Sequence, residues 1–363
     1  MMIVRGAIRV VLLVAIVCGT TWTRADGLGP SSLDASARPT PSPPFVRLST
    51  DIADADLVAG DDAFERGDLS EAEHRYSAAR ATQRGSVAAA VGVARVRIAR
   101  TGVPLDFGAA KGNGSVAAAM AELQRVVRHN PSFGPGFVEL GRARLLLGDA
   151  QGAVAAMRRG AAILVDDPEA HSELGVGLLA TGDIEGAIRE LSKAVDLDPG
   201  SGPRHGNLGT AFMMAGRSGE AVVEYEARVQ IDDADARAHS DLGTALLATP
   251  DLDRAVAELR RAVELGPSGA SFRQNLGYAL QQAGRIDDAI MEYRSALRLD
   301  PKLVSAWINL ATALARTPAT RGEARAALER ARSLSPSDPR VRANIAELDA
   351  LDHPGAVDAG AAR

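Results

Sequence analysis

Three histidines have the spacing that most suggests a chemical role. His171, His205 and His239 lie 34 residues apart, and imidazole nitrogens are common zinc ligands. A constant separation of that length places them on successive structural elements. Neighbouring histidines should then lie too far apart to share one ion at Zn–N distances of about 2.1 Å. We therefore expect them to pack between helices, and we predict no metal site.

No other arrangement of side chains indicates catalysis or cofactor binding. The chain has no HExxH string, no glycine-rich dinucleotide fingerprint and no Ser, His and Asp spacing that marks a triad. The glycine-rich stretch 108–115 contains Lys111 but lacks the Gly-Lys-Ser order of a phosphate-binding loop. Cys18 is the only cysteine, which excludes a cysteine-rich metal site. We predict that the protein is not an enzyme and uses no cofactor.

The elements that position these residues repeat with a fixed period. One motif occurs four times between Pro168 and Leu303. Its Leu-Gly pair recurs every 34 residues, at Leu174-Gly175, Leu208-Gly209, Leu242-Gly243 and Leu276-Gly277. An alanine follows each glycine at the same distance, as Ala187, Ala221, Ala255 and Ala289. Three copies close with Pro199, Pro267 and Pro301, whereas the second has Asp233 there. A constant period of this length indicates stacked repeats.

The copy 202–235 shows what each repeat should form. Apolar residues recur at helical spacing on two segments that flank the short turn Gly216-Arg217. This pattern predicts two antiparallel helices. Gly209 and Ala221 are small, which should let the two backbones approach each other. Neither helix can bury its apolar face alone, so neighbouring copies must stack.

The order of a large residue, Leu-Gly, Ala, a large residue, Ala and Pro resembles the tetratricopeptide repeat (TPR) family. The resemblance implies an all-α, right-handed α-solenoid of TPR helix-turn-helix repeats. Continuing the register gives about eight repeats over residues 53–351, with a 13-residue insertion at 103–115. A capping helix is expected over about 339–351, because terminal repeats need a polar outer face. We expect the insertion to be a surface loop, and no stretch remains for a separate catalytic domain.

The two ends of the chain have a different character. Residues 1–25 resemble a signal peptide, with Arg5 and Arg9 before a short apolar run and Thr23-Arg24-Ala25 as a cleavage site. We expect cleavage there and a periplasmic or secreted protein. An uncleaved segment that anchors the protein to the membrane, facing the periplasm, is the main alternative, and a lipoprotein signal at Cys18 is a weaker one. Residues 26–52 are rich in Pro and Ser and predict a disordered tether, and 352–363 a loose tail.

Net charge bears on the kind of partner. The chain has 41 basic and 46 acidic residues and a net charge of −5. Removal of residues 1–25 takes away three arginines and no acid, which moves the net charge to −8. An acidic body argues against a nucleic-acid partner.

The resemblance also implies a binding site. In the TPR family, places 2, 5, 6, 9, 12 and 13 of each repeat line a concave groove. Place six of successive repeats holds Glu173, Asn207, Asp241, Asn275 and Asn309. This column resembles the asparagine ladder of the superhelical repeats in protein O-GlcNAc transferases, which holds the backbone of a bound polypeptide. Further candidate groove residues are Leu179, Met213, Met214, Leu247 and Tyr278.

The chemistry of this column agrees with peptide binding. An asparagine amide both donates and accepts, so it can pair with both polar groups of a peptide unit. Asp241 can only accept, which interrupts the ladder. Two other interpretations remain open: the asparagines can be solvated groove residues, and the pair Met213 and Met214 can pack between repeats without a ligand.

These observations predict a non-enzymatic, extracytoplasmic scaffold that binds a polypeptide segment or a partner protein in its groove. One alternative is an assembly factor for envelope or secretion machinery. A glycosyltransferase-associated repeat protein is a more distant alternative.

Overall fold

A computed structural model describes residues 55–82, 86–103 and 107–352. These residues form two compact units, 55–231 and 232–352, here called the N-terminal unit and the C-terminal unit. The predicted signal peptide, the tether and nearly all of the tail lie outside the described residues.

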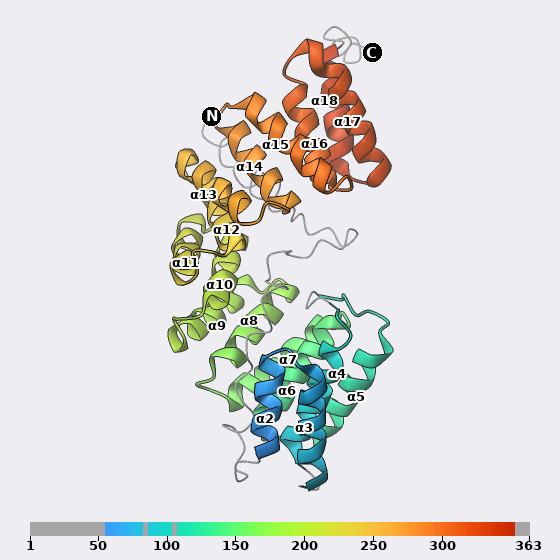
Figure 1. Cartoon of the computed structure of the whole chain (residues 1–363), viewed down its shortest axis with the longest axis vertical. Helices are drawn as coiled ribbons and strands as arrows, with labels where there is room; N and C mark the ends of the chain where they lie inside the picture. Colours follow the sequence, from blue (N-terminus) through green and yellow to red (C-terminus); the bar gives the residue numbers. More distant parts are fainter. Residues whose placement is uncertain (1–54, 83–85, 104–106, 353–363) are drawn as a thin grey trace, which may run out of the picture. The chain divides into compact units, whose positions relative to one another are not determined.

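The N-terminal unit consists of five successive helical hairpins (Figure 1). Its helices are α2 (Ala55–Glu65), α3 (Leu69–Thr82), α4 (Val87–Ala99), α5 (Gly114–His129), α6 (Gly134–Leu146), α7 (Ala150–Ile163), α8 (Pro168–Thr181), α9 (Ile184–Leu197), α10 (Gly202–Met214) and α11 (Ser218–Ile231). The even-numbered helices are the first helices of their hairpins, and each packs against the second helix that follows it.

The C-terminal unit continues the pattern with three hairpins and one final helix. Its helices are α12 (Ala236–Leu246), α13 (Leu252–Leu265), α14 (Ala270–Gln282), α15 (Ile286–Leu299), α16 (Val304–Leu314), α17 (Arg321–Leu334) and α18 (Pro339–Asp352), with a short 3₁₀ turn η2 (Pro318–Thr320) before α17. No strand occurs in the part of the chain that the structure describes. The predicted all-α fold of about eight helical hairpins and a capping helix is confirmed.

None of the described helices combines the length and the apolar character that a membrane span requires.

The turn inside a hairpin shows how the sequence ends one helix and begins the next. Gly182 follows α8 with a φ of +81°, a left-handed conformation that glycine adopts without steric cost. Asp183 comes next, and its Oδ1 accepts a hydrogen bond of 3.0 Å from the backbone N–H of Gly186. This bond satisfies one of the free donors at the start of α9. The Gly-Asp pair therefore fixes a tight reversal between the two helices.

Hairpin packing depends on the glycine of the Leu-Gly pair. A Cβ added to Gly175 would lie 2.5 Å from Leu191 Cγ on the facing helix. At Gly243 it would lie 2.6 Å from Leu259 Cγ and 3.1 Å from the backbone oxygen of Ala255. The glycine thus makes room for a large side chain as well as for close backbones, whereas the sequence indicated only close backbones.

The insertion between α4 and α5 is attached to the neighbouring repeat. The backbone N–H of Gly108 donates to the carbonyl oxygen of Leu145 at 2.9 Å, and that of Ala110 donates to Leu146 at 2.8 Å. Ala110 is only 2% exposed. In its described part, the predicted surface loop is therefore held against the C-terminal end of α6.

The final helix closes the apolar core of the C-terminal unit. Val341 and Leu348 of α18 are each 1% exposed, and Val341 packs in a cluster with Ile308 of α16. Arg342 and Glu347 are exposed. The capping helix thus has the polar outer face that the sequence predicted.

Candidate peptide-binding face

The column at place six lies on the first helices of five hairpins. Glu173 on α8 and Asn207 on α10 belong to the N-terminal unit. Asp241 on α12, Asn275 on α14 and Asn309 on α16 belong to the C-terminal unit. Asn309 is 9% exposed, and the other four are half-buried. The structure therefore places each of them at the same point of its hairpin.

The three asparagines differ in what their side chains bind. The Asn275 amide nitrogen donates to Ser240 Oγ at 3.3 Å. Within the described residues, the side chains of Asn207 and Asn309 make no hydrogen bond. An amide that is partly accessible and makes no internal bond can offer a donor and an acceptor to a partner. Asn207 is thus the more accessible of these two amides, and Asn309, at 9% exposed, offers only a small part of its surface.

Asn275 belongs to a chain of polar side chains that links three first helices of the C-terminal unit. Its Oδ1 accepts a long hydrogen bond of 3.5 Å from Gln274 Nε2. Gln274 Oε1 accepts a bond of 2.5 Å from Ser305 Oγ on α16. Together with Ser240 on α12, these contacts connect α12, α14 and α16. Asn275 therefore has a structural role that the sequence did not reveal.

The predicted apolar anchors lie mostly inside their own units. Leu179 is fully buried, and Met213, Leu247 and Tyr278 are each less than a tenth exposed. Met214 is half-buried. Most of this apolar surface packs within the repeats, so only a small part of it is available to a partner.

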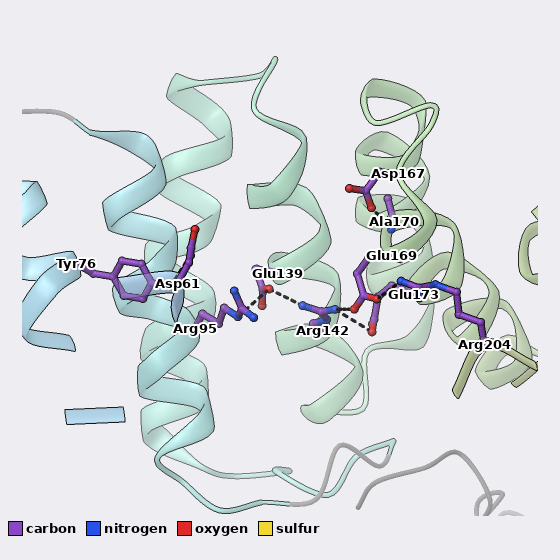
Figure 2. Close-up of polar contacts among 10 residues, drawn as sticks. All are labelled: Asp61, Tyr76, Arg95, Glu139, Arg142, Asp167, Glu169, Ala170, Glu173 and Arg204. Atoms are coloured by element: carbon purple, nitrogen blue, oxygen red, sulfur yellow. Dashed lines mark hydrogen bonds and ion pairs between the residues drawn. The ribbon is translucent and has the colours of Figure 1, made fainter. Parts of the chain in front are cut away.

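In the N-terminal unit, an ionic network connects first helices (Figure 2). Arg142 on α6 contacts three carboxylates, those of Glu139, Glu169 and Glu173. Arg204 on α10 contacts Glu169 at 3.3 Å and Asp198 at 2.5 Å. We call the set of Arg95, Glu139, Arg142, Glu169, Glu173, Asp198 and Arg204 the Arg142 network.

Figure 2 shows Arg142 between Glu139 on one side and Glu169 and Glu173 on the other. Arg95 on α4 extends the network, with its Nε 3.8 Å from Glu139 Oε1. The side chains of Glu139 and Glu169 are only 5% and 4% exposed. Burial raises the pKa of Glu169 to about 7, with Arg142 acting to lower it and Glu173 acting to raise it. Charged groups are thus shared across α4, α6, α8 and α10.

The histidine column has one repeated geometry. The ring Nδ1 of His171, His205 and His239 lies 2.6, 2.7 and 2.7 Å from the carboxylate of Glu190, Glu224 and Glu258. Each Nε2 lies 3.0–3.1 Å from the backbone oxygen six residues earlier, that of Val165, Pro199 or Asp233. Each histidine therefore ties its first helix to the second helix and to the preceding loop, in agreement with the predicted packing role. Within the described ranges, no group of three or more His, Cys, Asp or Glu residues could hold a metal ion.

Some members of the Arg142 network could have been found in the sequence. Glu139 occupies place six of its repeat, 34 residues before Glu173, so the column extends one repeat further than predicted. Arg142 and Arg204 occupy different places in their repeats and share no spacing. No sequence signal marks them as partners of one glutamate.

Comparisons with known proteins agree with this architecture. A tetratricopeptide repeat family model matches residues 173–236, 207–270 and 275–348. Among curated proteins, no sequence matches this chain significantly. The likeness to the repeats of protein O-GlcNAc transferases stays a prediction.

Three solved structures resemble parts of this chain to different degrees. The Cut9–Hcn1 complex of APC/C matches with a TM-score of 0.59 and 14% identity, covering 84% of this chain and 57% of that chain. PilF of Pseudomonas aeruginosa matches with a TM-score of 0.50 and 18% identity, over 61% of this chain and 99% of its own. MamA is 26% identical over 44% of this chain and 94% of its own, with a TM-score of 0.40. The hairpins, the 34-residue motif and the family match identify residues 173–270 and 275–348 as tetratricopeptide repeats.

Proposed function

We propose that this protein is a non-enzymatic scaffold that binds a polypeptide segment or a partner protein on the first helices of its repeats. The proposal rests on one observation, the lack of a hydrogen bond from the side-chain amides of Asn207 and Asn309 to any described residue. Each holds place six of its repeat, and neither amide bonds to a described residue. Amides in that state suit the backbone of an extended chain, because they can donate to its carbonyl groups and accept from its N–H groups.

The strength of such binding can be bounded. A net hydrogen bond contributes about 0.5–1.5 kcal/mol, whereas association costs about 4–15 kcal/mol. Each amide can therefore help to set the register of a chain bound to its own unit, without holding that chain tightly. Further affinity must come from side chains of the partner that fit between repeats, since Met213, Leu247 and Tyr278 are largely buried.

The proposal includes export. The positively charged start, the apolar run and the small residues at Thr23 and Ala25 support a signal peptide at 1–25. The scaffold would then act in the periplasm or outside the cell, or at the membrane if the segment is not cleaved. An assembly factor for envelope or secretion machinery would differ from this proposal only in its partner.

The test begins with crosslinking in the native host and mass spectrometry of the trapped partner. The purified partner is then titrated against wild type, Asn207→Ala/Asn309→Ala and the control Gln230→Ala, whose amide is exposed on α11. We expect the double variant to bind about tenfold or more weakly, which corresponds to about 1.4 kcal/mol, with unchanged helical content. The control should bind as wild type does. Equal affinity in the double variant and the wild type would exclude this binding mode.

A further inference from the structure

The Arg142 network buries carboxylates that share their arginines. Arg142 contacts three carboxylates, and Arg204 contacts two. An ionised carboxylate is costly to bury unless opposite charge compensates it. Arg142 is shared among three carboxylates, so each receives only part of its charge. Protonation of one buried carboxylate would relieve part of this cost.

Exposure and pairing indicate which carboxylate takes the proton. The side chains of Asp198 and Glu173 are 43% and 22% exposed, so water stabilises their charge. Glu139 and Glu169 are almost fully buried. Arg142 and Arg204 both contact Glu169, and each also contacts other carboxylates. Arg204 contacts Asp198, and Arg142 contacts Glu139 and Glu173. Protonation of Glu169 therefore removes more of the free-energy cost of burying ionised carboxylates than protonation of the other three.

The groups that face Glu169 come from several elements. On its own helix or at its start are Glu173 and Asp167, which both act to raise its pKa. Arg142 from α6 and Arg204 from α10 act to lower it. Glu139 of α6 and Asp198, which follows α9, compete for these two arginines.

The second helices α7 and α9 also pack against α8. Among their ionisable side chains, Arg158 of α7 lies 3.8 Å from Asp183. Glu190 of α9 pairs with His171 at 2.6 Å. These groups thus have partners of their own outside the Arg142 network.

We propose that the Arg142 network is a pH-sensitive link between the first helices α6, α8 and α10, in which one proton bound at Glu169 stabilises the packing of these helices. The raised pKa of Glu169, about 7, indicates the pH range in which this proton would bind. A carboxyl whose pKa is higher in the folded state than its unfolded value of about 4.3 favours the folded state most when protonated. Its stabilising effect is full below about pH 4 and is lost as the pH rises through 7.

The link acts on the candidate binding face of the N-terminal unit. Glu173 belongs to the network and occupies place six on α8, and Asn207 occupies place six on α10. A change in how α8 and α10 are held would therefore alter the spacing of these two side chains. The link itself does not depend on the proposed function, because its test measures opening of helices without any partner.

The test is hydrogen exchange with mass spectrometry on the full chain at pH 6 and pH 8, corrected for the intrinsic pH dependence of exchange. Protection reports the free energy of local opening. We expect protection of α6, α8 and α10 to be about tenfold lower at pH 8, the ratio that a pKa shift from about 4.3 to about 7 produces. Glu169→Gln should remove this difference and keep the higher protection at both pH values. The control Glu185→Gln, on α9 with a side chain 70% exposed, should behave as wild type does.

Two results would overturn the proposal. One is equal corrected protection of these helices at pH 6 and pH 8 in the wild type. The other is a Glu169→Gln variant that keeps the wild-type difference. If Glu169→Gln does not fold, Glu173→Gln decides the matter, because Glu173 shares Arg142 with Glu169 and acts to raise the pKa of Glu169. It should move the transition in protection to lower pH, and an unmoved transition would contradict the link.

Discussion

The ring of Tyr225 occupies the space that a side chain at Gly209 would need. A Cβ added to Gly209 on α10 would lie 2.8 Å from Cε1 of Tyr225 on α11. The Tyr225 hydroxyl also lies 3.0 Å from Thr210 Oγ, so the ring is held at both its edge and its tip. Gly277 and Tyr293 form the same relationship in the C-terminal unit, at 2.7 Å. Each hairpin of this kind packs a ring or a branched side chain directly onto a glycine.

Gly209→Ala should therefore destabilise the protein although alanine favours helices. The added methyl group overlaps a ring that cannot move freely, and overpacking of this kind costs about 1–3 kcal/mol. Chemical denaturation followed by circular dichroism measures the change. Gly219→Ala is the matched control, because nothing lies within 4 Å of a Cβ at that position on α11. The control should be neutral or more stable by up to about 1 kcal/mol, and a similar loss in both variants would contradict the packing argument.

The fold could be predicted because its landmarks repeat. The spacing of Leu208-Gly209 and Ala221 placed the two helices of a hairpin and the turn between them. It did not reveal that Tyr225, sixteen residues after Gly209, is the side chain for which the glycine makes room. A glycine in the sequence indicates that something packs closely against that position. Which side chain packs there depends on how the two helices are rotated relative to each other.

The bond between His205 and Glu224 should stabilise the hairpin that contains it. His205 Nδ1 lies 2.7 Å from Glu224 Oε2, and the His205 side chain is 11% exposed. A hydrogen bond to a charged group contributes about 1.5–3 kcal/mol. A double-mutant cycle with His205→Ala and Glu224→Ala should therefore give a coupling energy in that range.

Trp307 provides the comparison for this cycle. It occupies the same place in its repeat and donates from Nε1 to the Pro301 carbonyl oxygen at 3.0 Å. The corresponding bond to His205 involves the Pro199 carbonyl oxygen, so both side chains bind the preceding loop. The bond to the preceding loop is therefore common to both side chains. The coupling energy measured by the cycle reports the additional contact between His205 and Glu224. Single substitutions whose effects simply add would show that the pair contributes no coupling.

The Arg142 network shows what could not be predicted from the sequence. Arg142 and Arg204 both contact Glu169, from positions 27 and 35 residues away. Arg142 contacts three glutamates and Arg204 contacts one glutamate and one aspartate, and which carboxylates each arginine reaches depends on the spacing of neighbouring first helices. That spacing appears only once the repeats are stacked.

Asn207 and Asn275 share one column, yet their replacement should affect stability differently. Asn275→Ala removes the bond to Ser240 Oγ and the link to Gln274, and it should cost about 0.5–1.5 kcal/mol. Asn207→Ala removes no bond to a described residue and should change stability by less than about 0.5 kcal/mol. Urea denaturation of the two variants compares them directly. A large loss for Asn207→Ala would mean that its amide is structural and would weaken the proposed binding role.

The start of the capping helix should depend on pH through Asp338. This residue precedes α18 and is 5% exposed. Its Oδ1 accepts a bond of 2.8 Å from the backbone N–H of Arg340, and its Oδ2 one of 2.7 Å from the Arg340 guanidinium. Burial acts to raise the pKa of Asp338, but the hydrogen bonds from Arg340 outweigh burial and hold the pKa below its usual value.

The sign of the effect follows from this lowered pKa. The carboxylate stabilises the folded state above the unfolded pKa of about 3.9, and this contribution is lost as the pH falls through the folded pKa. Asp338→Ala should therefore destabilise α18 by about 0.5–2 kcal/mol at pH 7, the range for loss of a helix cap. The difference from wild type should narrow as the pH is lowered towards 3, as measured by hydrogen exchange of α18. Asp251→Ala serves as the comparison, because the Asp251 side chain is exposed and caps α13 with a longer bond of 3.2 Å to the Arg254 N–H. A difference at Asp338 that stays constant from pH 7 to pH 3 would mean that its charge contributes nothing to the cap.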